Sequence, residues 1–490
     1  MRTRIHVLTL QAAAALVAAL TLGPFTAAAP AAQSQTRLAY ALQGGRVHTA
    51  AGAPIDNATV IIRNGVIAEV GAGVSVPADA VVVDVTGLNV YPGLIDMASD
   101  APIDTGDAPA APAFGGRGGG GGRGGGRGGG GQEFETREDA ERAKRENILR
   151  PDYRAAEHLR TTSDDQRALA SAGVTTVLAV PASGIFKGQS ALVNVVVAPD
   201  DPQVSAIADY RKGLGVVKSP VASHIDMGGR GGGQGYPQSL LGTVAFTRQE
   251  LLNAQWQRDA LAHYDRHGSR GPRPLVEPAL DALAPVLAGA MPAAFDANEP
   301  REIDRALGMA AEFGLTPIVV GARGAAERTD ELRAANATVI LSLNPAGGGR
   351  GGGRGGRGGG GGQQSLRALQ AQQNAPKIPA ALAAAGVPFA FTSGGQAPAE
   401  FVRNAGRAVS EGGLAADAAL RALTLDAARL AGADSRTGSI EQGKIANLVV
   451  TEGDLLGGGR VRHVFIDGRP VEVEEPTGGP GAGRGRGGGR

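Results

Sequence analysis

"YPGLIDMASD", residues 91–100, is the stretch that decides the fold, because the pattern of the chain changes around it. Before it, residues 37–90 alternate short β-rich runs with turns. In the clearest of these, TVIIRNGVIAEV, the pair Asn64-Gly65 is typical of a type I′ hairpin turn. The stretch itself is typical of a buried strand with a short polar end. After it, apolar strand-like runs alternate with helix-like stretches.

Four of the later runs have the length and composition of buried strands: GVTTVLAV (173–180), TPIVVGA (316–322), TVILSLN (338–344) and VPFAFTS (387–393). Between them, PREIDRALGMAAEFG predicts a helix whose apolar stripe is Ile303, Ala306, Ala310 and Phe313. Alternating strands and helices indicate a parallel sheet with crossover helices. We therefore expect an α/β fold over residues 91–432, a closed (β/α)₈ TIM barrel, with an open doubly wound sheet as the alternative.

After Leu430 the pattern returns to short strands, in GSIEQGKIANLVVTEGDLL and RVRHVFIDGRPVEV. A barrel that interrupts a small β domain accounts for this symmetry. The sequence thus predicts a composite β-sandwich built from residues 37–90 and 437–473.

Gly/Arg tracts interrupt this plan at residues 115–131, 228–235, 346–362 and 478–490. They offer almost no side chains to bury, so we expect low-complexity, disordered segments. The first three tracts follow the carboxyl ends of predicted strands, so we expect them to emerge on one face of the barrel. There their arginines form a cationic fringe over the barrel mouth, or the tracts are long loops that the fold tolerates without a role.

The first residues have the pattern of a secretory signal peptide over 1–31: Arg2 and Arg4, a short apolar run, then small residues. The net charge of +1 provides no field that would attract nucleic acid or an anionic membrane. The Gly/Arg tracts also lack the interleaved aromatic residues of nucleic-acid binders. The absence of cysteine excludes disulfides and thiolate chemistry. We expect a periplasmic or secreted bacterial protein without a membrane anchor after cleavage.

Four segments together resemble the metal-dependent amidohydrolase superfamily, in its periplasmic, imidazolonepropionase-like branch: GGRVHTAAGAPIDNATVIIRNGVIAEVG, VVVDVTGLNVYPGLID, LRALTLDAARLAG and GSIEQGKIANLVV. The resemblance implies a TIM barrel beside a β-sandwich made from both chain ends. It also implies a hydrolase of carbon–nitrogen bonds other than peptide bonds, in small cyclic amides, with divalent zinc as the cofactor.

The family's metal ligands are a His-x-His after Pro-Gly-x-Ile-Asp, a Lys or Glu on the fourth strand, histidines ending the fifth and sixth strands, and an aspartate ending the eighth. The positions that we can align fall on Ala98, Asp100, Asp296, Gly321 and Gly394. The alanine and the glycines offer no side-chain donor atom. The aspartates are oxygen ligands, which favour hard ions over zinc. The resemblance therefore implies a degraded metal site.

Two other groups of residues are candidates for residual chemistry. In SPVASHIDM the alternation of side chains places His224 and Asp226 on one strand face. They could be metal ligands at a shifted position, completed by Asp100 and Asp296, or a hydrogen-bonded pair at a strand end. In SGIFKGQSALVNV, Lys187, Gln189 and Ser190 form the expected ligand loop, or an ordinary polar loop.

The sequence leaves two functions open. The first is a secreted amidohydrolase-family hydrolase of small cyclic amides whose activity is weak, altered or absent. The alternative is a pseudoenzyme that binds a small molecule or a partner without catalysis.

Overall fold

The computed structural model describes residues 39–99, 136–159, 163–195, 215–228, 237, 239–268, 272–344 and 366–473. The predicted signal peptide, Asp100, three of the Gly/Arg tracts and nearly all of the tract at 228–235 lie outside these residues. Within the described part of the chain, no helix combines the length and the apolar character needed to cross a bilayer.

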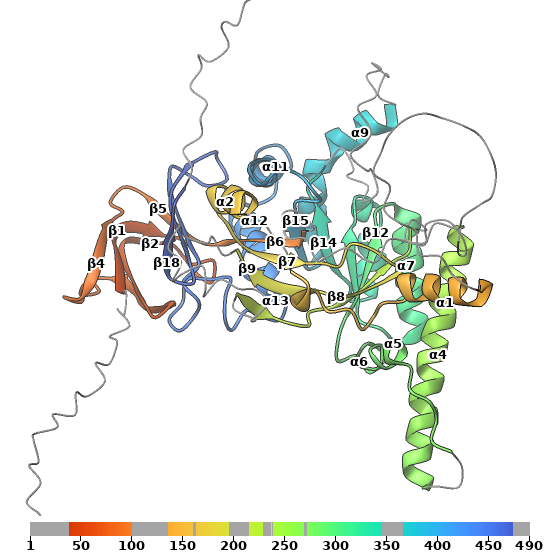
Figure 1. Cartoon of the computed structure of the whole chain (residues 1–490). Helices are drawn as coiled ribbons and strands as arrows, with labels where there is room; N and C mark the ends of the chain where they lie inside the picture. The colour runs from red at the N-terminus through yellow and green to blue at the C-terminus, as the bar shows by residue number, and fades with distance from the viewer. Residues whose placement is uncertain are drawn as a thin grey trace, which may run out of the picture. The chain divides into compact units, whose positions relative to one another are not determined.

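One sheet of eight strands is built from both ends of the described chain (Figure 1). Its strands are β1 (Ala39–Val47), β2 (Ile55–Arg63), β3 (Val66–Ala72), β4 (Ala80–Asp84), β5 (Asn89–Pro92), β16 (Leu448–Glu452), β17 (Arg460–Ile466) and β18 (Arg469–Val471). The strand order is β18-β17-β16-β5-β1-β2-β3, and β4 also pairs with β1. Side chains from both ends, such as Val60, Val90, Leu448 and Phe465, share one apolar cluster. The hydrogen bonds form a single sheet, so the predicted sandwich stays a prediction.

The turn between β2 and β3 confirms the predicted hairpin. Asn64 and Gly65 have φ angles of 55° and 83°, and Arg63 pairs with Val66 across the turn. Positive φ at both central residues is what a type I′ turn requires.

The middle of the chain forms two further sheets among the described residues. The first contains β6 (Leu94–Ser99), β7 (Val174–Ala179), β9 (Ala191–Asn194) and β10 (Val216–Lys218). The second contains β8 (Phe186–Gln189), β11 (Ser223–Asp226), β12 (Ala293–Ala297), β13 (Pro317–Gly321), β14 (Thr338–Ser342) and β15 (Phe389–Thr392). Strands β11 to β15 pair in parallel and in chain order, without the reversal of a doubly wound sheet. The four strand-like runs of the sequence correspond to β7, β13, β14 and β15, and the fold is mixed α/β.

The described strands do not form the closed eight-stranded barrel that the sequence predicted. Strands β8 and β9 flank Ser190 and run antiparallel to β11 and β7 respectively, so the two sheets meet at Ser190 without a continuous ladder. On the other side β6 and β15 lie close to each other. There the N–H of Ser393 donates to the carboxylate of Asp96, 2.8 Å away, where a closed barrel would have a backbone ladder. The side chain of Asp96 thus connects β6 to the residue after β15 in place of backbone pairing.

In the described chain a helix follows each of the parallel strands β11 to β15. The described α-helices are α1 (Arg137–Ile148), α2 (Ser163–Ser171), α4 (Leu240–His267), α5 (Pro278–Asp281), α6 (Ala284–Leu287), α7 (Pro300–Phe313), α8 (Thr329–Ala334), α9 (Leu366–Asn374), α10 (Ile378–Ala385), α11 (Pro398–Ser410), α12 (Ala416–Leu423) and α13 (Leu425–Leu430). The predicted stripe of α7 is confirmed, since Ile303, Ala306, Ala310 and Phe313 are all buried. A capping box between Glu299 and Glu302 fixes the start of this helix.

The side chains of the parallel strands alternate between two faces, and each face contributes to a different apolar cluster. Phe295, Val319 and Phe391 pack with the helices in the largest cluster. Their neighbours Ala294 and Val320 belong to a smaller cluster on the opposite face of the strands. Because side chains alternate in direction along a strand, every second residue of β11 to β15 points toward this second cluster. His224, Asp226 and Asp296 lie on this inner face, in register with Ala294 and Val320.

A ring of polar side chains joins the eight-stranded sheet to the four-stranded one. Asn447 donates to Thr176 Oγ1 at 3.1 Å and to Asn194 Oδ1 at 2.9 Å. Asn194 donates to Asp467 Oδ1 at 2.6 Å, and the N–H of Asp467 donates to Asn447 Oδ1 at 2.9 Å. Each buried amide has partners on both sides, which avoids the cost of an unsatisfied polar group.

Candidate functional site

Four charged or titratable side chains gather near the carboxyl ends of β11 and β12; we call them the carboxyl-end cluster. They are Lys187 of β8, His224 and Asp226 of β11, and Asp296 of β12. In the parallel register Asp226 lies opposite Asp296, and β8 pairs antiparallel with β11 beside them. Three elements that are distant in the sequence therefore bring two carboxylates, an ammonium and an imidazole together.

Two members of the cluster form an ion pair, between Lys187 Nζ and Asp296 Oδ2. The Lys187 side chain is 2% exposed and that of Asp296 is 19% exposed. An ammonium removed from water in this way needs a partner, because desolvation of an unpaired charge costs several kcal/mol. Asp296 supplies that partner and is itself held in place.

His224 and Asp226 lie on the same face of β11, as the alternation in the sequence indicates. His224 is fully buried, and Asp226 is only partly buried at the strand end. The Oδ1 atom of Asp226 accepts the N–H of Gly228 at 2.7 Å, an Asx-type turn that ends the strand. One oxygen of this carboxylate thus has a structural role.

The family ligand positions are Ala98, Asp296, Gly321 and Gly394 in the described residues, with Asp100 outside them. Ala98, Gly321 and Gly394 all have positive φ angles, of 61°, 93° and 58°. A Cβ atom at Gly321 would overlap Asn298 Oδ1, and one at Gly394 would overlap Ser342 Oγ. The two glycine positions therefore have no room for a ligand side chain in their present conformation.

The described residues do not supply the donor set of the family's zinc centre. Within the described ranges, no group of three or more His, Asp or Glu side chains is arranged to hold a metal ion. Asp296, the one aligned carboxylate that is described, already binds the ammonium of Lys187. Structural and catalytic zinc sites both need at least three protein ligands, and His224 with Asp226 supplies two.

The segment with Lys187, Gln189 and Ser190 is not the loop that the sequence predicted. Lys187 and Gln189 belong to β8, Ser190 separates β8 from β9, and all three are buried. Gln189 Nε2 donates to the carbonyl of Pro151 at 3.0 Å, and Ser190 Oγ donates to the carbonyl of Ala222 at 3.3 Å. Antiparallel pairing on both sides draws the segment into the sheets. The contact of Lys187 with Asp296 spans 109 positions, and no local pattern indicates it.

Asp96 is a second buried carboxyl that the sequence patterns did not single out. It is 1% exposed, on β6, and accepts the N–H of Ser393. Burial raises the pKa of Asp96 to about 6, and hydrogen bonds to Ser393, Thr392 and Ser99 partly offset this rise. The sequence YPGLID could have indicated this role, because a carboxylate inside an apolar strand needs a hydrogen-bond donor close to it.

Comparisons with known proteins agree with this fold. Residues 362–471 match the amidohydrolase family model. An amidohydrolase from Thermotoga maritima MSB8 is similar in structure, with a TM-score of 0.66 and 21% sequence identity over 89% of this chain and 100% of that chain. A second solved amidohydrolase has a TM-score of 0.50 and 15% identity, over 89% of this chain and 99% of the other. No protein of curated function matches the sequence.

The family match at the C-terminal end and the shared fold support the amidohydrolase superfamily. At these identities the structural likeness concerns the fold alone. The periplasmic branch and the substituted ligand positions remain predictions of the sequence.

Proposed function

We propose that this chain is a secreted protein with the scaffold of an amidohydrolase-type hydrolase, a pseudoenzyme in which zinc-dependent hydrolysis of non-peptide C–N bonds is lost. The observation that carries this proposal is the ion pair of Lys187 with Asp296. The ammonium brings a positive charge to the carboxylate at the fifth-strand position, where the family pattern has a metal-binding histidine.

The charges of the carboxyl-end cluster also support the loss of metal binding. Asp226 and Asp296 are register neighbours, and two carboxylates so placed repel each other unless a cation lies between or beside them. Lys187 supplies that cation from the chain itself. A divalent ion would have to displace a buried ammonium, and would then leave Lys187 without its partner.

Metal analysis tests this proposal. After exposure to zinc and desalting, the wild-type protein should retain well under one zinc ion per chain by elemental analysis. The variant His224→Ala/Asp226→Ala is the control and should give the same low content. Stoichiometric zinc in the wild type that is lost in this variant would overturn the proposal.

A second candidate is residual hydrolysis of small cyclic amides, for which the single-face arrangement of His224 and Asp226 on β11 is the favouring observation. An imidazole and a carboxylate side by side are suited to proton transfer to a leaving nitrogen. The test is a panel of five- and six-membered cyclic amides, assayed with the wild type and with His224→Ala. Turnover that this variant abolishes would establish the second candidate and remove the first. Turnover unchanged by the variant would come from a contaminant.

A further inference from the structure

A cavity opens at the opposite end of the parallel strands from the carboxyl-end cluster; we call it the amino-end pocket. It encloses about 450 Å³ and is lined by the amino ends of β14 and β15 and by residues of α10, α12 and α13. Ligand sites for small molecules commonly have volumes of roughly 300–1,000 Å³. The pocket is therefore large enough for a compact organic molecule, and it shares no residue with the carboxyl-end cluster.

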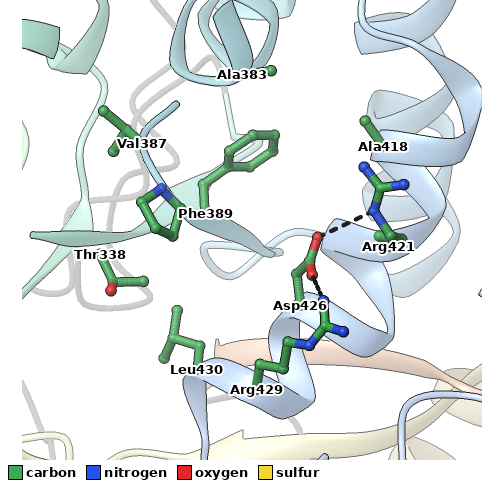
Figure 2. A pocket seen from close by; sticks show the side chains of 10 residues that line it. Thr338, Ala383, Val387, Phe389, Ala418, Arg421, Asp426, Arg429 and Leu430 are labelled. Atoms are coloured by element: carbon green, nitrogen blue, oxygen red, sulfur yellow. Dashed lines mark hydrogen bonds and ion pairs between the residues drawn. The ribbon is translucent and has the colours of Figure 1, made fainter. Parts of the chain in front are cut away.

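One side of this pocket is apolar. Val387, Pro388 and Phe389 line it from β15 and the residues before it, and Leu430 lines it from the end of α13 (Figure 2). Phe389 and Leu430 are only partly buried, so their apolar surface remains accessible from the cavity. Covering such surface with an apolar ring removes it from water, which favours binding.

The other side carries two guanidinium groups around one carboxylate. Asp426 Oδ1 lies 2.9 Å from Arg429 Nη1, and its Oδ2 lies 3.6 Å from Arg421 Nε (Figure 2). The side chains of Arg421 and Arg429 are 46% and 56% exposed, so much of each guanidinium faces solvent. With two positive charges and one negative charge, the lining has a surplus of one positive charge.

A neighbouring carboxylate does not cancel this surplus. Hydrogen bonds to Lys444 and Ser439, and to a smaller extent the charge of Arg429, lower the pKa of Glu441. Glu441 lies 2.6 Å from Lys444, which offsets its charge directly. The positive charge of the pocket therefore remains available to a ligand.

We propose that the amino-end pocket binds a small organic monoanion, a carboxylate joined to an aromatic or branched apolar group. The carboxylate takes the outward N–H groups of Arg421 and Arg429, whose planar forks match its two oxygens. The apolar group lies against Phe389 and Leu430. This site is independent of the function proposed above, because it lies at the other end of the strands and none of its residues belongs to the carboxyl-end cluster.

Calorimetric titration with phenylacetate, and with its neutral isostere phenylacetamide, tests the proposal on the unmodified full-length chain. Saturable one-site binding of phenylacetate, at least about tenfold tighter than that of the amide, is expected, since charge-assisted hydrogen bonds are stronger than neutral ones. Equal affinities for the two compounds, or no saturable binding of phenylacetate, would overturn it.

Variants then locate the site. Arg429→Gln should weaken phenylacetate binding at least about tenfold, and Arg421→Gln should do the same, by loss of one charge-assisted contact each. Arg333→Gln is a matched control, because Arg333 is also an exposed helical arginine, 3.1 Å from an aspartate three residues before it. Wild-type affinity in the Arg421→Gln/Arg429→Gln double variant, or an equal loss in the control, would contradict the assignment.

Discussion

The charged side chains at the two ends of the parallel strands differ in their burial and in their partners. At the carboxyl ends, Lys187 and Asp296 bind each other in a nearly closed site. At the amino ends, Arg421 and Arg429 line an open pocket and remain about half exposed. In a TIM barrel, the fold that the sequence predicts, the site lies at the carboxyl ends of the strands. Here that end is occupied by the chain's own side chains, and the room for a ligand is at the other end. The contrast predicts that substitutions at the carboxyl ends reduce stability and that substitutions at the amino ends reduce binding.

The largest effect is expected for Lys187→Met. The change leaves the carboxylate of Asp296 without its cation, and breaking a buried pair from one side costs about 3–5 kcal/mol. Urea unfolding followed by circular dichroism measures the loss. The double variant Lys187→Met/Asp296→Leu should recover most of it, because no charge is then left unpaired. A single variant as stable as the wild type would break the contrast between the two ends.

The next effect is the pH dependence contributed by Asp96. Its pKa is raised to about 6, against about 3.9 in an unfolded chain, so the native state binds more protons between these values. The contribution of this carboxyl to stability is therefore fully present below about pH 4 and is lost as the pH rises through about 6, by up to roughly 3 kcal/mol.

Asp96→Asn should remove that dependence. The free energy of unfolding of the wild type, relative to this variant, should fall between pH 4 and pH 7 in urea titrations at each pH. Parallel profiles of the two proteins would show that Asp96 is ionised in the native state throughout this range.

A smaller loss is expected for Gly394→Ala. This residue has a φ of 58°, and a Cβ there overlaps Ser342 Oγ. We expect a loss of about 2–3 kcal/mol, from the left-handed backbone and the overlap together. Gly395→Ala is the matched control, because its φ is 82° but a Cβ there meets nothing within 4 Å, so about 1–2 kcal/mol is expected. Equal losses in thermal or urea unfolding would show that the carboxyl end is less tightly filled than described.

The smallest effect on stability is expected for Arg429→Ala at the amino ends. Its ion pair with Asp426 is largely exposed, and such pairs contribute about 0–1 kcal/mol. The melting temperature should change by no more than a few degrees, while phenylacetate affinity falls as described above. A large loss of stability would mean that the pocket residues serve mainly to hold α13 in place.

Local patterns predicted the parts of the fold that depend on neighbours in sequence. Asn64-Gly65 predicted its turn, and the stripe from Ile303 to Phe313 predicted α7, because both follow from backbone preference and periodicity. The reversal at Ser190 could not be predicted, since SGIFKGQSALVNV becomes strand only by pairing with β7 and β11. The site was also predicted only in part. The sequence indicated Lys187 and Asp296 as separate candidates, but their ion pair depends on tertiary structure and could not be predicted.

The eight-stranded sheet has a consequence for the order in which the chain folds. β5 pairs with β1, near the start of the described chain, and with β16, near its end. During synthesis the edge of β5 that β16 covers stays open until residues 448–452 have emerged, and pairings between such distant segments form slowly. An open strand edge can pair with the same edge of another molecule. Chains that stall before β16 emerges are therefore expected to aggregate through β5, so the yield of folded protein depends on synthesis continuing past residue 452.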